Sequence, residues 1–355
     1  MKKLKNILII LFPHIKWIVK FKNANKKAKV NGFTKKVWAF RKGFYPYTVD
    51  VCEINSHNKH EFINERFFED LHPINGKYSS IIDNKLFLPF LFKDYPELIP
   101  EYYFLLNKGR LIKIEKDGNE WQDVLELLKS KKILALKRMG GSQGQGFIIL
   151  EHRNNQFLFN KEPVGLKYLN SFLNKLDEYL ITEYVDQADY SAKINNDSVN
   201  TVRYVCARDL KKHKFFIARS YHRFGRKGSY VDNLGSRKGG ISVMIDIDSG
   251  KLKNIGLFKH NGKLEKITGK IVHPDSKQII TGISIPDWNR ITQRVLEFLD
   301  HMSFLKFAAL DIVITNKGFK VLEINTMPDL SAIQVEGGLL QDSRLQDFFL
   351  AMNKN

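Results

Sequence analysis

The chain has 355 residues, of which 43% are hydrophobic and 27% are charged, and it contains no low-complexity tract. This composition is ordinary for a globular protein and excludes a disordered or fibrous chain, while the length allows one large or two medium domains. The net charge of +19 is unusual and indicates an acidic partner, such as anionic lipid, nucleic acid or another polyanion.

The basic charge is concentrated at the start of the chain. Residues 1–42 contain 13 lysines and arginines and no acidic residue. Within them, the apolar stretch 7–19 is too short to cross a bilayer and is interrupted by Pro13 and Lys16. Two interpretations stay open: a helix lying in a membrane interface with Trp17 as its aromatic residue, or a basic amphipathic helix packed on the main domain.

Hydrophobic periodicity and turn residues predict the elements of the first half of the chain. In chain order they are a helix over 60–75, an apolar segment over 83–92 that carries Lys85, strands over 102–106 and 111–114, and a helix over 119–132.

A strand over 133–138 carries Lys137 and continues into a glycine-rich loop, and a second strand follows directly. The loop contains Gly140, Gly141, Ser142, Gly144 and Gly146. Glycines allow a tight turn whose N–H groups can close over phosphate oxygens. The pattern is neither a Walker A loop nor a Rossmann loop, because a strand follows it and not a helix. A plain glycine hairpin is an equally good interpretation.

The second half of the chain is predicted to be rich in strands that carry arginines. The expected elements are a helix over 168–176, strands over 180–185, 200–207, 215–221 and 241–247, and a helix over 288–302. Arg203 and Arg219 lie on two of these strands and Arg223 follows the second, so that the three arginines fall within 21 residues. Exposed strand arginines are the ordinary alternative, but three so close together favour an anion-binding site.

Residues 309–325 predict a β-hairpin around Asn316-Lys317-Gly318. If the loop takes all three residues, Asp311 lies opposite Glu323, and Asn325 follows on the same face of the strand. Two carboxylates and an amide on one buried face suit Mg²⁺. A two-residue loop would place Asp311 and Glu323 on opposite faces, and a solvated hairpin edge is the alternative to a metal site.

The order of these features resembles the ATP-grasp superfamily, and in particular its sugar-transfer-associated branch, which is found with bacterial surface-polysaccharide genes. The resemblance covers about residues 76–345. It rests on motifs such as Ser198-Val199-Asn200-Thr201-Val202-Arg203, Asp232-Asn233-Leu234, Val272-His273-Pro274-Asp275 and Glu323-Ile324-Asn325-Thr326-Met327-Pro328. It implies an α+β fold in which two α+β subdomains sandwich ATP. The expected parts are a basic, partly helical region over 1–75, an N-terminal ATP-grasp part over 76–185 and a C-terminal part over 186–355.

The resemblance also implies roles for individual residues. Lys137 and, by a weaker match, Lys85 would contact the ATP phosphates, and Gly140 to Gly146 would form the loop over them. Glu183, Tyr184 and Val185 would form the adenine hinge. Asp311, Glu323 and Asn325 would hold Mg²⁺, usually two ions, while Arg203 and Arg219 would face the γ-phosphate and an acyl-phosphate. The acceptor would lie among Arg219, Arg223, Asn233 and Arg237.

These expectations favour an ATP- and Mg²⁺-dependent carboxylate–amine ligase that acts on a small-molecule or lipid-linked glycan acceptor, with 1–42 in peripheral contact with anionic membrane. An ATP-grasp kinase that phosphorylates a hydroxyl and a non-enzymatic polyanion-binding protein are the alternatives. No pattern of a nucleic-acid-binding domain is present. Cys52 and Cys206 fit no zinc or disulfide framework, so we expect a cytoplasmic protein, with or without peripheral membrane contact.

Overall fold

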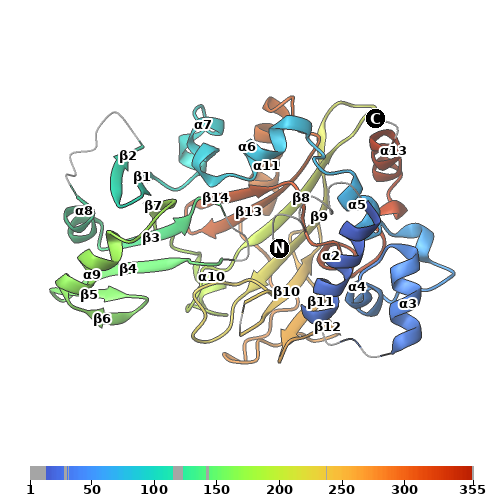
Figure 1. Cartoon of the computed structure of the whole chain (residues 1–355), viewed down its shortest axis with the longest axis horizontal. Coiled ribbons are helices and arrows are strands. Elements are labelled where there is room, and N and C mark those ends of the chain that lie inside the picture. The colour runs from blue at the N-terminus through green and yellow to red at the C-terminus, as the bar shows by residue number, and fades with distance from the viewer. Residues whose placement is uncertain are drawn as a thin grey trace.

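The computed structural model describes residues 13–27, 30, 32–114, 123–140, 144–236 and 238–353. The predicted α+β architecture is confirmed, with two antiparallel sheets of seven strands each and helices at the N-terminal end (Figure 1). Among the described residues, no helix combines the length and apolar character needed to cross a membrane.

The first sheet is built from the middle of the chain and has the order β2-β1-β7-β3-β4-β5-β6. Its strands are β1 (Tyr102–Asn107), β2 (Arg110–Lys113), β3 (Ile133–Arg138), β4 (Ile148–Arg153), β5 (Gln156–Phe159), β6 (Glu162–Val164) and β7 (Tyr179–Glu183). Helices α8 (Val124–Lys131) and α9 (Leu166–Leu173) place Leu127, Leu128 and Leu169 in one core with these strands. The predicted start of the first of these helices, at 119, lies outside the described residues.

The second sheet has the order β12-β11-β10-β9-β8-β13-β14. Its strands are β8 (Val202–Arg208), β9 (Phe215–Phe224), β10 (Gly240–Ile245), β11 (Leu252–His260), β12 (Lys263–Thr268), β13 (Phe307–Thr315) and β14 (Gly318–Asn325). The long helix α11 (Trp288–His301) buries Ile291, Val295 and Phe298 against one face. The strand predictions for this half are confirmed, and β11 and β12 are two strands that were not predicted.

Helices from both ends of the chain cover the other face of the second sheet (Figure 1). They are α2 (Pro13–Lys27), α3 (Phe33–Lys42), α4 (Pro46–Val51), α5 (Glu65–Asp70), α12 (Leu330–Ile333) and α13 (Ser343–Met352). Trp17 of α2 is only 4% exposed, and its ring stacks on Tyr45 with 5.4 Å between the ring centroids. Trp17 therefore packs against the protein, as the second interpretation of this helix predicted. Residues 1–12 lie outside the described residues.

Short helices occupy the connections between the longer elements. They are η1 (Lys59–Glu61), η2 (Gly76–Tyr78), α6 (Ser79–Ile82), η3 (Lys85–Phe87), α7 (Leu88–Leu91), η4 (Pro96–Leu98), α10 (Asp189–Ala192) and η5 (Leu339–Gln341). The helix expected over 60–75 is limited to α5. Ile82, Leu88 and Phe92 belong to the core that β8, β13 and α11 share, so this connecting segment packs on the second sheet.

Candidate functional site

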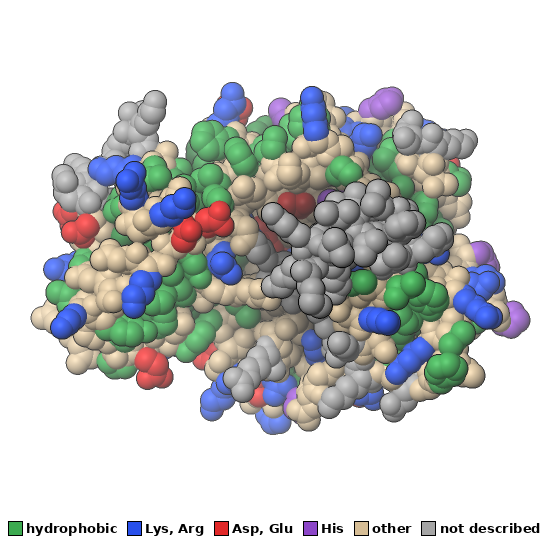
Figure 2. All heavy atoms as spheres, viewed as in Figure 1, with side chains coloured by type: hydrophobic (Ala, Val, Ile, Leu, Met, Phe, Trp, Pro, Cys, Tyr) green, Lys and Arg blue, Asp and Glu red, His purple; other side chains and the backbone are tan. Residues whose placement is uncertain are grey.

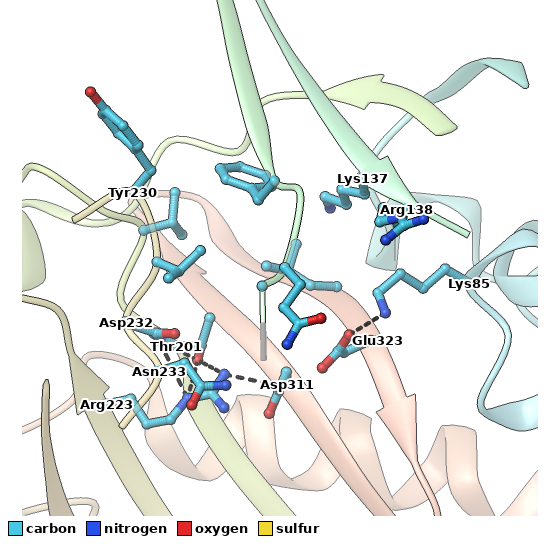
Figure 3. Close-up of a pocket in the computed structure, with 16 residues that line it drawn as sticks. Lys85, Lys137, Arg138, Thr201, Arg223, Tyr230, Asp232, Asn233, Asp311 and Glu323 are labelled. Atoms are coloured by element: carbon cyan, nitrogen blue, oxygen red, sulfur yellow. Dashed lines mark hydrogen bonds and ion pairs between the residues drawn. The ribbon is translucent and has the colours of Figure 1, made fainter. Parts of the chain in front are cut away.

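A pocket of about 130 Å³ lies where the two sheets meet, and both contribute side chains to it (Figure 3). Lys137 and Arg138 come from β3, Gly144 from the glycine-rich loop, and Asp311 and Glu323 from the β13–β14 hairpin. Its other lining residues are Lys85, Gln145, Phe147, Val199, Thr201, Arg223, Tyr230, Val231, Asp232, Asn233 and Leu322. The pocket thus brings together residues that are far apart in the sequence. They come from the elements predicted to bind phosphate and from the hairpin predicted to bind a metal ion.

The hairpin reaches the predicted pairing by an unpredicted route. Thr315 pairs with Gly318, so the loop has two residues and not three, and the assumed loop length was wrong. A β-bulge at Leu322 then shifts the register by one, and Asp311 pairs with Glu323 as predicted. Along β14 the buried residues are Phe319, Val321 and Ile324, which shows the shift directly. The bulge therefore keeps Glu323 and Asn325 on the same face as Asp311.

Asp311 is 2% exposed and lies between two arginines of neighbouring strands. Arg203 forms a two-pronged ion pair with its carboxylate through Nε and Nη2, and Arg223 Nη2 donates to Asp311 Oδ2 at 2.9 Å. Burial raises the pKa of Asp311 against the opposing effect of the two guanidiniums. A carboxylate this enclosed is already neutralised by protein cations.

Glu323 is more open, with a side chain 24% exposed and one lysine partner. Lys85 Nζ lies 2.7 Å from Glu323 Oε2, and Asn325 Nδ2 donates to Glu323 Oε1 at 3.1 Å. A dashed line marks the ion pair between Lys85 and Glu323 in Figure 3. Burial disfavours the charged form, but Lys85 and the neighbouring donors outweigh it and hold the pKa of Glu323 well below its usual range. Glu323 is therefore an ionised carboxylate at neutral pH, as the predicted ligand role requires.

Lys137 and Lys85 supply the positive charge on the first-sheet side of the pocket (Figure 3). Burial, and then the nearby Lys85, lower the pKa of Lys137 to about 8. Two ammonium groups facing one pocket repel each other, and a bound polyanion relieves that repulsion. This arrangement fits the phosphate role predicted for both lysines.

The glycine-rich loop is described only in part, because Gly141 and Ser142 lie outside the described residues. Gly144 lines the pocket, and a Cβ at this position would lie 2.5 Å from Val231 Cγ1. Gly146 has a φ of +74° and lies against Tyr179, while Gly140 has open space around it. The loop thus approaches the 230–233 segment closely, and its glycines at 144 and 146 are required by space and by backbone conformation.

Eight of the predicted site residues that the structure describes do not line this pocket: Gly140, Gly146, Glu183, Tyr184, Val185, Arg203, Arg219 and Asn325. Glu183 ends β7 and accepts a hydrogen bond from the Glu101 N–H at 3.1 Å, while Tyr184 and Val185 follow the strand. Arg219 points toward the C-terminal segment, where Nη2 donates to the Gly338 carbonyl at 3.3 Å and Nε lies 3.7 Å from Glu336. The position beside Asp311 belongs instead to Arg223, which the sequence analysis placed among the acceptor candidates.

Thr201 and Asp232 are site residues that sequence reasoning did not assign. Asp232 Oδ2 accepts from the Thr201 N–H at 2.7 Å and from its hydroxyl at 2.6 Å, and Arg223 Nε lies 3.4 Å away. This network fixes the Arg223 guanidinium next to Asp311. Both residues stand in the motifs quoted for the resemblance, and that was the only signal for them.

A second and larger cavity of about 700 Å³ adjoins the pocket on the helix-covered face of the second sheet. Arg223, Asn233 and Glu323 line both spaces. Arg203, Tyr221 and Ser242, which lie on strands of the second sheet and form the cavity floor, line it together with Asn325. A group bound in the pocket and a group bound in the cavity would therefore meet at Arg223 and Glu323.

The hairpin donors fit a Mg²⁺ ion that is also held by phosphates. Glu323 and Asn325 offer accessible oxygens, while Asp311 lies directly opposite and is enclosed by arginines. Within the described ranges, no group of three or more His, Cys, Asp or Glu residues is arranged to hold a metal ion by itself. Mg²⁺ commonly takes only one or two carboxylates and completes its shell with phosphates and water, so this donor set is sufficient.

The chain is similar to several solved structures at low sequence identity. The chain is 13% identical to D-alanine–D-alanine ligase from Bacillus anthracis (TM-score 0.37), covering 77% of this chain and 67% of that one. It is 12% identical to the ATP-grasp ligase PsnB complexed with precursor peptide PsnA2 and AMPPNP (TM-score 0.40; 79% and 62%). It is 12% identical to D-alanyl-alanine synthetase A from Vibrio cholerae O1 biovar eltor str. N16961 (TM-score 0.40; 80% and 68%). The chain thus spans about two thirds of the length of these solved proteins.

No curated protein matches the sequence. The model of one protein family, described as sugar-transfer associated ATP-grasp, matches residues 64–348, which is most of the chain and includes both sheets. The expectation drawn from the sequence motifs is confirmed: the chain belongs to the sugar-transfer associated ATP-grasp family.

Proposed function

We propose that the protein is an ATP- and Mg²⁺-dependent carboxylate–amine ligase that attaches an amine or amino acid to a glycan or acyl acceptor in bacterial surface-polysaccharide assembly. ATP-grasp proteins are typically ATP-dependent ligases that use Mg²⁺, which supports the general class. The observation that carries the proposal is the junction of a lysine-lined pocket with a much larger cavity at Arg223 and Glu323. That geometry suits the transfer of phosphate from a nucleotide on one side to an acceptor on the other.

The reaction would proceed in two balanced steps. A carboxylate oxygen of the acceptor attacks the γ-phosphorus of ATP, the bond to the β-phosphate oxygen breaks, and ADP leaves. The amine nitrogen then attacks the acyl carbon, inorganic phosphate leaves with the C–O bond electrons, and the nitrogen loses a proton. Mg²⁺ at Glu323 and Asn325 would supply charge neutralisation for the phosphates when bound.

The chain's own residues would position and neutralise the reacting groups. Lys137 and Lys85 would bind the ATP phosphates, and Gly144 would let the loop lie close over them and exclude water. Arg223 would stabilise negative charge that develops between the two spaces, because Thr201 and Asp232 hold its guanidinium in place. Arg203 would hold Asp311 in the ionised form.

An assay of ADP and phosphate release tests this function. The wild type would be supplied with Mg²⁺, ATP and pairs drawn from a panel of amino acids and uronic acids, and products would be identified by mass spectrometry. We expect turnover that requires both an acid and an amine, an amide product, and loss of turnover in Glu323→Gln. A phosphorylated alcohol in place of an amide would identify a kinase, and absence of both Mg·ATP binding and turnover would reject the enzyme.

A further inference from the structure

The large cavity has a wall that comes from outside the family-matched part of the chain. Lys16 and Lys20 of α2 and Tyr45 and Tyr47 next to and within α4 all line it, whereas the family model begins at residue 64. The cavity floor, in contrast, is formed by the second sheet, where Arg203 and Arg223 lie within the family-matched residues. The N-terminal helices thus add a surface to the reaction centre that the matched fold does not itself provide.

This wall is firmly attached. The ring of Trp17 stacks on Tyr45 with an interplanar angle of 10°, the Tyr45 N–H donates to Glu65 Oε2 at 2.8 Å, and the Tyr45 hydroxyl donates to Glu69 Oε1 at 2.7 Å. Lys20 Nζ lies 2.6 Å from the other oxygen of Glu69. These contacts join α2 and α4 to α5, so the wall has a fixed geometry before any ligand arrives.

Two hydroxyls at the cavity lack partners. Ser242 on the floor is 3% exposed, and its buried Oγ makes no hydrogen bond with the described part of the chain. Among the described residues, none forms a hydrogen bond with the Tyr47 hydroxyl either. The buried Ser242 hydroxyl is costly without a partner, whereas Tyr47 is half-buried. A ligand with several hydroxyl groups can form hydrogen bonds with both side chains. Asn233 and Asp329 add further polar atoms to the lining.

The cavity also carries positive charge. The carboxylates at its far end are engaged, since Glu65 accepts from Tyr45 and Thr48, Glu69 from Lys20 and Tyr45, and Asp329 caps α12 through Ser331. No ion pair joins Lys16 to a carboxylate of the described chain. Arg203 and Arg223, which also line the cavity, are held by Asp311 and Asp232, so the attraction for an anionic ligand comes from Lys16. A volume of about 700 Å³ is large for a lone phosphate or a single amino acid.

We propose that the N-terminal helices form the acceptor-binding wall of the active site, and that the acceptor is an anionic, polyhydroxylated molecule, namely a sugar that carries a carboxylate or phosphate. Lys16 contributes attraction for the charge, and Tyr47 and Ser242 bind hydroxyl groups. The inference rests on the proposed function, because it assigns the second substrate of the same reaction. It places part of the specificity for that substrate, at Lys16 and Tyr47, outside residues 64–348.

Ligand-observed NMR and calorimetry on the full chain with Mg²⁺ and a non-hydrolysable ATP analogue test the inference. The probes are glucuronic acid and glucose 6-phosphate, with glucose and inorganic phosphate as probes that each lack one feature. We expect the anionic sugars to bind more tightly than either single-feature probe. Lys16→Ala and Tyr47→Phe should each weaken their binding about tenfold, as loss of a hydrogen bond to a charged or polar group does.

The matched control is Lys22→Ala, an exposed lysine of α2 that does not line the cavity, and it should bind like the wild type. The proposed acceptor wall is overturned if Lys16→Ala and Tyr47→Phe bind the anionic sugars as the wild type does. It is also overturned if the wild type binds these sugars no more tightly than glucose or phosphate. Separate titration with the ATP analogue keeps the two proposals apart. A wild type that binds no Mg·nucleotide overturns the proposed function, whereas intact nucleotide binding with unaffected sugar binding overturns only the inference.

Discussion

Lys137 lies on β3 close to Lys85, and this neighbourhood determines the pH at which it carries charge. Its pKa is lowered to about 8, so the ammonium is present below about pH 8 and is lost as the pH rises through that value. We therefore expect affinity for ATP to fall about tenfold between about pH 7 and 9, and binding above pH 8 to take up a proton from the buffer. Calorimetry in buffers of different ionisation enthalpy measures both quantities.

Lys137→Arg is the control, because an arginine keeps its charge over this pH range. Its ATP affinity should be flat with pH. If the wild type is equally flat, the side chain that contacts the phosphates is not Lys137.

Asp311 and Glu323 face each other across the hairpin but should respond differently to loss of charge. Asp311→Asn leaves Arg203 and Arg223 buried without their common counter-charge, so we expect a loss of about 3–5 kcal/mol in the free energy of unfolding. Glu323→Gln removes one partner of a half-buried lysine, and we expect about 1 kcal/mol or less. Urea unfolding curves measure both.

The substitution that affects stability less should affect Mg·ATP binding specifically. Glu323→Gln should stay folded and lose Mg²⁺-dependent ATP affinity, which separates a ligand role from a structural one. Equal destabilisation by the two substitutions would contradict the difference in burial and partners between the two carboxylates.

At the scale of elements, the hairpin shows what a sequence can predict and what it cannot. The β-branched runs around Asn316-Lys317-Gly318 predict two strands, and the need to bury one face predicts that Asp311 and Glu323 share the other. The loop is one residue shorter than predicted, and the bulge adds one residue back. The predicted pairing of Asp311 with Glu323 was therefore correct although the predicted loop length was wrong. The bulge depends on packing of Leu322 in the pocket, which is a tertiary property without a local signal.

The β11–β12 hairpin is a different case, because its signal was present and was missed. Asn261-Gly262 separates two segments that alternate in polarity, and this dipeptide is a strong indicator of a two-residue hairpin turn. The Arg223–Thr201–Asp232 network has no such local signal. It forms only when β8, β9 and the 230–233 segment are assembled, and so the choice of Arg223 over Arg219 required the structure.

The glycine-rich loop gives a prediction at the same scale. Gly144 has a φ of +66°, and an added Cβ would overlap Val231 across the pocket. Gly144→Ala should therefore move the loop away from the 230–233 segment and raise the KM for ATP about tenfold through a cost of about 1–2 kcal/mol. Steady-state kinetics of ATP turnover measure the change.

Gly140→Ala in the same loop is the matched control. A Cβ there meets nothing within 4 Å, so KM should change by less than about twofold. An equal effect at both positions would mean that general loop stiffness, and not the approach to Val231, limits nucleotide binding.

For the whole molecule, the order of motifs was enough to recognise the family and its α+β fold, and the site for ATP between the two parts stays a prediction. The sequence could not show where the N-terminal region packs, because its lysines and aromatic residues are compatible with a membrane surface or a protein surface. Packing of Trp17 on Tyr45 removes the aromatic residue that an interfacial helix would use. On the face shown in Figure 2, lysines and arginines are spread over both halves of the molecule and do not form one continuous stripe.

The excess charge of residues 1–42 remains, and it leads to a prediction about membranes. With 13 basic residues and no acid in this region, we expect binding to vesicles that contain phosphatidylserine and none to neutral phosphatidylcholine vesicles. Since Trp17 is buried, the attraction should be electrostatic and should disappear in about 0.5–1 M salt, where the Debye length falls to a few ångströms.

Lys22→Glu with Lys42→Glu, two exposed positions, should weaken sedimentation with the vesicles by at least about tenfold, since each charge contributes about 1 kcal/mol. The control is Lys167→Glu, an exposed lysine on α9 of the first sheet, which should leave binding unchanged. Salt-resistant binding would instead require insertion of apolar residues. An equal effect of the double variant and of Lys167→Glu would show that net charge alone, and not the N-terminal region, attracts the protein to the surface.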